Sequence, residues 1–103
     1  MSQSGFVAVL VIDLHFPEAG SLKAKRKELS SIKAQLQGRL GVAVAETAHQ
    51  DLWQRARLLG ALTGGSATRL AATADNVERW LLARCPDGAN VQRVITSVED
   101  LLP

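Results

Sequence analysis

The sequence is poor in the residues that usually mark chemistry. It has a single cysteine, Cys85, which excludes an internal disulfide and any metal cluster built from cysteines. It has two phenylalanines, two tryptophans and no tyrosine. That supply is too small for the paired sheet aromatics on which RNA-recognition motifs stack bases. These absences disfavour a redox or cysteine-metal protein and that mode of RNA binding.

Long hydrophobic runs are also missing. The apolar run at residues 6–12 is too short to cross a membrane, and no basic segment precedes it as in a signal peptide. We therefore expect a soluble, cytoplasmic protein with no membrane partner.

What the sequence does contain is a regular order of secondary structure within a single domain, residues 1–103. β-branched runs, helical periodicity and Gly/Pro breaks predict the elements. Strands are expected at 6–16, 42–48, 54–63 and 91–98, helices at 21–36 and 67–84, a hairpin tip at 49–53, a flexible tail at 1–4 and a turn at 85–90.

This β-α-β-β-α-β order predicts an α+β, ferredoxin-like sandwich, in which two helices cover one face of a four-stranded antiparallel sheet. The first and third strands should be central. The other sheet face would be bare, with Val7, Val9 and Val11 on it. A bare apolar face usually marks a contact surface, so we expect a homodimer or a protein partner there.

The first helix is the most unusual stretch, SLKAKRKELSSIKAQL. Ser21 is suited to cap its start, and an apolar stripe runs along one side. Four of its five cations crowd the first two turns, where the helix dipole disfavours positive charge. Lys23 and Lys27 should project away from the stripe, whereas Lys25, Arg26 and Lys33 should lay their stems along apolar surface and carry their charges outward. The cations are Lys23, Lys25, Arg26, Lys27 and Lys33.

Charge is unevenly distributed along the chain. Residues 21–57 carry eight Lys/Arg and three Asp/Glu, whereas the rest carries four and seven. The hairpin tip adds Trp53, which either folds back onto the sheet or meets a partner, followed by Arg55 and Arg57. A basic surface with a stacking plane is suited to RNA; the alternative is a solvated basic face.

Catalytic motifs are absent. The sequence has no Ser-His-Asp order, no phosphate-cradling glycine loop and no nucleophile elbow. An acylphosphatase-like enzyme would need an anion loop after the first strand, where Glu18 would repel the substrate. We therefore expect neither an enzyme nor a cofactor.

Two histidine–carboxylate pairs are the only candidates for metal ligands or a general base. Asp13 and His15 form one pair, and His49 and Asp51 form the other. A metal needs three or four converging ligands, so we expect no metal site.

Three pieces of the sequence together resemble the YlxP-like family of small bacterial proteins, a domain family of unknown function. They are SLKAKR at 21–26, VAVAE at 42–46 and QDLWQRA at 50–56. The resemblance spans nearly the whole chain and implies the ferredoxin-like fold. It also implies a gene often found among those for transcription and translation factors. It supplies no catalytic residues.

Taken together, these patterns predict a non-enzymatic protein that binds RNA or a ribosomal particle through the first helix and the hairpin tip. A protein-interaction or homodimerisation module on the open sheet face is the second hypothesis. A small-ligand or metal-binding regulatory domain is the third.

Overall fold

The computed structural model of the chain describes residues 5–103. The tail predicted at residues 1–4 lies outside the described residues. The elements are β1 (Phe6–His15), α1 (Leu22–Gly38), β2 (Ala43–Ala48), β3 (Arg55–Gly64), α2 (Ala67–Arg84), β4 (Ala89–Ser97) and α3 (Val98–Leu101).

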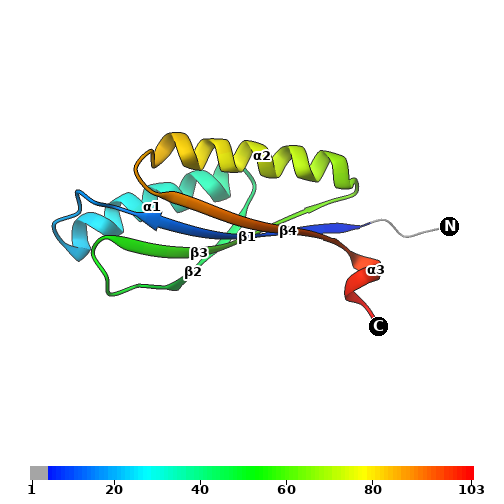
Figure 1. Cartoon of the computed structure of the whole chain (residues 1–103), viewed down its shortest axis with the longest axis horizontal. Coiled ribbons are helices and arrows are strands. Elements are labelled where there is room, and N and C mark those ends of the chain that lie inside the picture. Colours follow the sequence, from blue (N-terminus) through cyan, green and yellow to red (C-terminus); the bar gives the residue numbers. More distant parts are fainter. Residues whose placement is uncertain (1–4) are drawn as a thin grey trace.

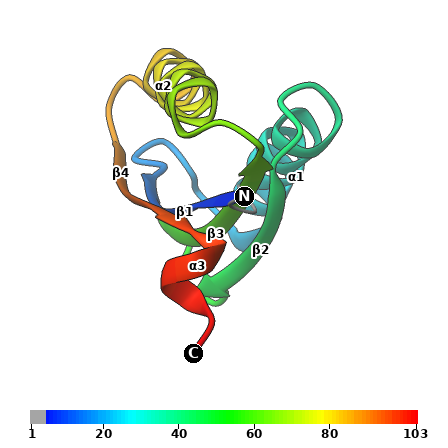
Figure 2. The same cartoon turned by 90° about the vertical axis from the view of Figure 1, so that its right-hand side faces the viewer.

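The four strands form one antiparallel sheet in the order β2-β3-β1-β4. Helices α1 and α2 lie side by side over one face of it (Figures 1 and 2). The predicted ferredoxin-like α+β sandwich and the central position of the first and third strands are therefore confirmed.

The core lies between the sheet and the two helices, and strict alternation places residues in it. Along β1, Ala8, Leu10, Ile12 and Leu14 are buried, while the residues between them face the open side. The helices contribute stripes with a period of 3–4 residues, because that spacing keeps side chains on one face. The buried apolar residues of these stripes are Leu29, Ile32, Leu36, Leu70, Ala74, Val77 and Leu81.

Both long helices begin where the sequence predicts. The Ser21 hydroxyl accepts a hydrogen bond from the backbone N–H of Ala24 at 3.0 Å. The Ser66 hydroxyl accepts one from the backbone N–H of Arg69 at 3.3 Å. Each cap satisfies one of the N–H groups that a helix start leaves free.

The C-terminal part differs from the prediction in two ways. β4 begins at Ala89, inside the predicted turn, because Gly88 brings the chain against β1: its carbonyl accepts the backbone N–H of His15 at 2.7 Å. The predicted strand also ends one residue early, since Ser97 caps the short helix α3. α3 lies on the opposite side of the sheet from α1 and α2 (Figure 2).

None of the helices in residues 5–103 has the length and apolar character needed to cross a membrane.

Candidate nucleic-acid interface

Lys25 is the residue around which the candidate site is built, and it is completely buried. It occupies the same stripe of α1 as Leu29, Ile32 and Leu36. The expectation that Lys25 carries its charge outward is therefore wrong. Helical spacing turns this side chain toward the sheet, and the ammonium group is satisfied by oxygen atoms inside the protein.

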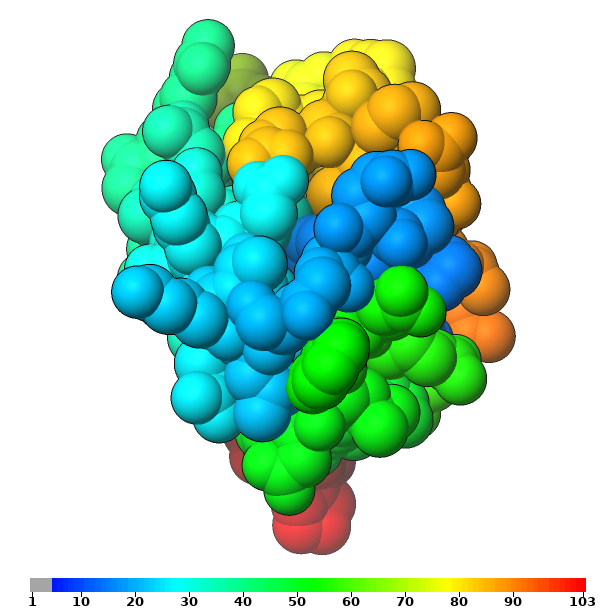
Figure 3. All heavy atoms as spheres, turned by 90° about the vertical axis from the view of Figure 1, so that its left-hand side faces the viewer, coloured from blue at the N-terminus to red at the C-terminus, as the bar shows by residue number. Residues whose placement is uncertain are grey.

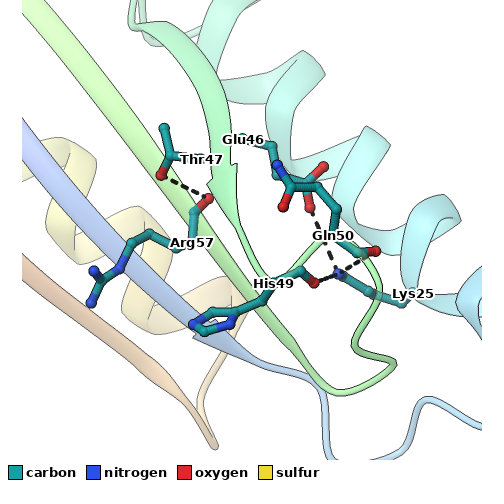
Figure 4. A network of polar contacts seen from close by, with 6 residues as sticks. All are labelled: Lys25, Glu46, Thr47, His49, Gln50 and Arg57. Carbon is teal, nitrogen blue, oxygen red and sulfur yellow. Dashed lines mark hydrogen bonds and ion pairs between the residues drawn. The ribbon is translucent and has the colours of Figure 1, made fainter.

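Those oxygen atoms come from the end of β2 and the hairpin tip (Figure 4). The Lys25 ammonium donates to the carbonyl oxygen of His49 at 2.6 Å and contacts that of Gln50 at 3.4 Å. The Glu46 carboxylate lies 3.6 Å away as an ion-pair partner. A buried ammonium needs such partners, because removing its charge from water costs several kcal/mol of folding free energy when no partner compensates.

The tip, residues 49–53, is thus tied to the start of α1. His49 adopts a left-handed backbone conformation, with φ of 65°, and its carbonyl also accepts the N–H of Leu52 at 3.1 Å. On the other side of the tip, the Gln54 side chain donates to the carbonyl of Pro17 at 3.1 Å. Three chain segments therefore meet at one end of the molecule (Figure 3).

The remaining cations of the first turns do face solvent. Lys23, Arg26 and Lys27 are exposed, and the first turn of α1 contains no acidic residue. Lys33 is half-buried and lies farther along the same helix. The basic surface is therefore smaller than the sequence suggested, by one buried lysine.

Trp53 does not fold back onto the sheet. Its exposed fraction is 53%, and that of its neighbour Leu52 is 46%. A tryptophan so exposed offers a broad ring face to a partner. The sequence analysis did not include Leu52 in the site. Its position in the tip, outside every predicted strand and helix, already indicated an exposed side chain.

The two arginines after the tip lie on a different surface. β-pairing puts Arg55 opposite His15 and Arg57 opposite Asp13, so both arginines face the open side of the sheet. Arg57 binds both carboxylate oxygens of Asp13, at 2.8 and 3.0 Å. These hydrogen bonds hold the pKa of Asp13 below its ordinary value, because they favour the ionised form.

The histidine–carboxylate pairs are not brought together as a metal site. The carboxylate of Asp13 is engaged by Arg57. Within residues 5–103, no group of three His, Cys, Asp or Glu side chains is placed to hold a metal ion.

Cys85 is a free, buried cysteine at the end of α2. It borders a hollow of about 270 Å³ between the β1–α1 loop and the α2 end, next to the Arg84–Glu28 ion pair. Burial raises the pKa of the Cys85 thiol, so the thiol stays protonated and is a poor nucleophile.

The fold and this site define a small ferredoxin-like α+β protein with a basic, aromatic end. The family described as a protein of unknown function, DUF503, matches residues 7–94, and the chain belongs to that family. A curated relative is the uncharacterized protein YlxP of Bacillus subtilis (strain 168). It is 33% identical over 82 residues, which cover 80% of this chain and 85% of the relative.

A solved structure with the same architecture is the de novo designed protein Foldit4. It superimposes with a TM-score of 0.56 at 10% identity, covering 90% of this chain and 97% of the designed one. At that identity the likeness concerns the fold alone.

Proposed function

We propose that this protein is a non-enzymatic RNA-binding protein that contacts RNA, or a ribosomal particle, through the end formed by α1 and the tip. The observation that carries the proposal is the buried Lys25 contact. By bonding to the His49 and Gln50 carbonyls, Lys25 fixes the tip beside the exposed cations of α1.

Two kinds of interaction then act on one ligand. Lys23, Arg26 and Lys27 attract phosphates, and their affinity for a polyanion depends on salt because counterions are released. Trp53 supplies a face on which an unpaired base stacks. A rigid tip strengthens binding because less conformational entropy is lost on association.

Single-stranded segments of RNA fit this end better than a regular duplex. Bases in a duplex are stacked on one another, whereas bases in loops are free to stack on an aromatic side chain. Arg55, at the base of the tip, extends the basic surface toward the open sheet face, and Lys33 extends it along α1. Arg57 is already engaged by Asp13 and contributes less.

The test is a titration of purified protein against ribosomal RNA at several salt concentrations. Changing Lys23→Glu and Lys27→Glu together should reduce the slope of log affinity against log salt by roughly 1.4–1.8, from 0.7–0.9 per lost contact. Changing Arg69→Glu and Arg79→Glu on α2 alters net charge equally at two other exposed positions, and should change the slope far less.

Trp53→Ala tests the stacking contribution separately. It should weaken binding to single-stranded RNA by about 1–3 kcal/mol, or roughly 5- to 150-fold, and have little effect on a duplex of equal length. Equal losses from the α1 and α2 charge changes, with no effect of Trp53→Ala, would show that binding is non-specific and would overturn the proposal.

A further inference from the structure

The open face of the sheet carries an apolar surface that no helix of the described chain covers. Helices α1 and α2 cover the opposite face of the sheet, and α3 lies past the end of the strands (Figures 1 and 2). The exposed fraction is 63% for Val94 and 42% for Leu59. We call this surface the valine face; it comprises Val7, Val9, Val11, Leu59, Ala61 and Val94.

In the central row of this surface, the strand register separates small side chains from large ones. Across the sheet, Val9 is paired with Ala61 of β3 on one side and with Val94 of β4 on the other. Ala61 is paired in turn with Ala43 of the edge strand β2. One half of the row therefore consists of alanines and the other half of valines.

This arrangement is complementary to itself. Consider a two-fold axis that runs parallel to the strands, above the open face and midway between β1 and β3. It places β3 of one copy over β1 of the other, and β2 of one copy over β4 of the other. A second copy would then place its Ala61 over Val9 and its Ala43 over Val94. Large side chains meet small ones throughout the row, as close packing of two sheets about 10 Å apart requires.

The same two-fold axis also relates the charged residues at one end of the open face. Asp13 on β1 is paired with Arg57 on β3, at one level of the sheet. The two-fold axis therefore sets Asp13 of each copy opposite Arg57 of the other, so four charges alternate in sign. Opposite charges in register favour this orientation over one with the strands reversed.

The area of the face is close to the lower limit for a stable dimer. The strands have 10, 6, 10 and 9 residues. At about 3.3 Å per residue and about 4.8 Å between strands, the sheet has an area of roughly 550 Å². A standard protein interface buries about 600–1,000 Å² on each partner. α3, which ends at the exposed Leu101 and is followed by the exposed Leu102, lies on the same side of the sheet and adds apolar surface (Figure 2).

From this register we propose that the valine face is a symmetric dimer interface whose partner is a second copy of this chain. The proposal does not depend on RNA binding through the tip and the exposed surface of α1. Arg55 and Arg57, at the charged end of the open face, lie where the two surfaces adjoin. The dimer leaves Lys23 and Lys27 free, so the double change at these residues should not alter the dimer dissociation constant.

Sedimentation equilibrium over a wide range of protein concentration tests it. The wild-type protein should approach twice the chain mass of 11.0 kDa. Val94→Asp should raise the dimer dissociation constant at least about tenfold, since a carboxylate buried without a donor costs more than 1.4 kcal/mol. The matched control is Leu82→Asp, at an exposed leucine on α2, which should leave the dimer intact.

Circular dichroism should show that each variant is folded. Should Val94→Asp prove unfolded, Val94→Thr decides the matter, because it keeps the side-chain shape and buries a hydroxyl in the interface. It should weaken the dimer by several-fold. A wild-type protein that stays monomeric at every concentration would overturn the proposal. So would a dimer that responds to neither Val94 variant.

Discussion

The two ends of this molecule are built on different principles (Figure 1). At one end, polar contacts hold the start of α1, the β1–α1 loop and the tip together, with Lys25 at the centre. At the other end, β1 begins and α3 leaves the sheet, and apolar side chains such as Leu101 remain uncovered. Buried polar contacts hold the segments at the first end in one arrangement, whereas the exposed apolar surface at the second end is suited to contact with a partner.

The largest expected effect concerns the polar end. Lys25→Met keeps most of the side-chain volume but leaves Glu46 and two carbonyl groups without their partner. We expect the free energy of unfolding to fall by about 3 kcal/mol, as when one member of a buried pair is removed. Urea unfolding measures it, with Lys27→Met as the exposed control expected to change stability by about 0.5 kcal/mol or less. Similar values for the two variants would contradict the role of Lys25.

The second prediction compares one substitution at the two ends. A Cβ added at Gly88 would lie 2.4 Å from the Cβ of His15, whereas one added at Gly65 meets nothing within 4 Å. Gly88→Ala should therefore cost about 1–3 kcal/mol of stability through overpacking. Gly65→Ala should be neutral or stabilising by up to about 1 kcal/mol, because it restricts the unfolded chain. Thermal unfolding of both variants gives the comparison, and a reversed order would contradict the close approach of β4 to β1.

At the apolar end, Leu101→Ser combined with Leu102→Ser removes exposed leucines that pack on little of the chain itself. The unfolding free energy of the monomer, measured at low concentration, should change by about 0.5 kcal/mol or less. A loss as large as that of Lys25→Met would show that these leucines belong to the core of the folded chain.

The smallest expected effect is a pH dependence. Arg57 lowers the pKa of Asp13 below 3.8, so the unfolded chain binds this proton more tightly than the folded chain. The stabilisation by the pair is complete above pH 3.8 and is lost as pH falls through the lowered pKa. Asp13→Asn should therefore lose less stability than the wild-type protein on acidification below that value. Parallel pH profiles of the two proteins would contradict this assignment.

Much of the fold was predictable because it depends on local patterns. Alternation along residues 6–16, caps at Ser21 and Ser66, and helical periodicity located the strands and helices to within a few residues. The start of β4 was missed because Gly88 is held by a backbone bond to β1, a contact between distant parts of the chain.

The candidate site was predicted less completely. The sequence placed Lys23, Arg26, Lys27 and Trp53 in the site, and the structure exposes all four of these side chains. It treated Lys25 as one more surface cation, although its spacing from Leu29 is that of a buried stripe. Composition alone does not reveal that a lysine is buried, because burial depends on oxygen atoms supplied by another segment.

The sequence by itself determined the element order, the two-faced character of β1 and the concentration of positive charge in one helix, because each depends on neighbours within a few positions. The tertiary structure decided which lysine is buried, which arginine is paired with Asp13 and which residues of the valine face meet across the sheet. These features depend on strand register and helix docking, which bring together residues far apart in the chain.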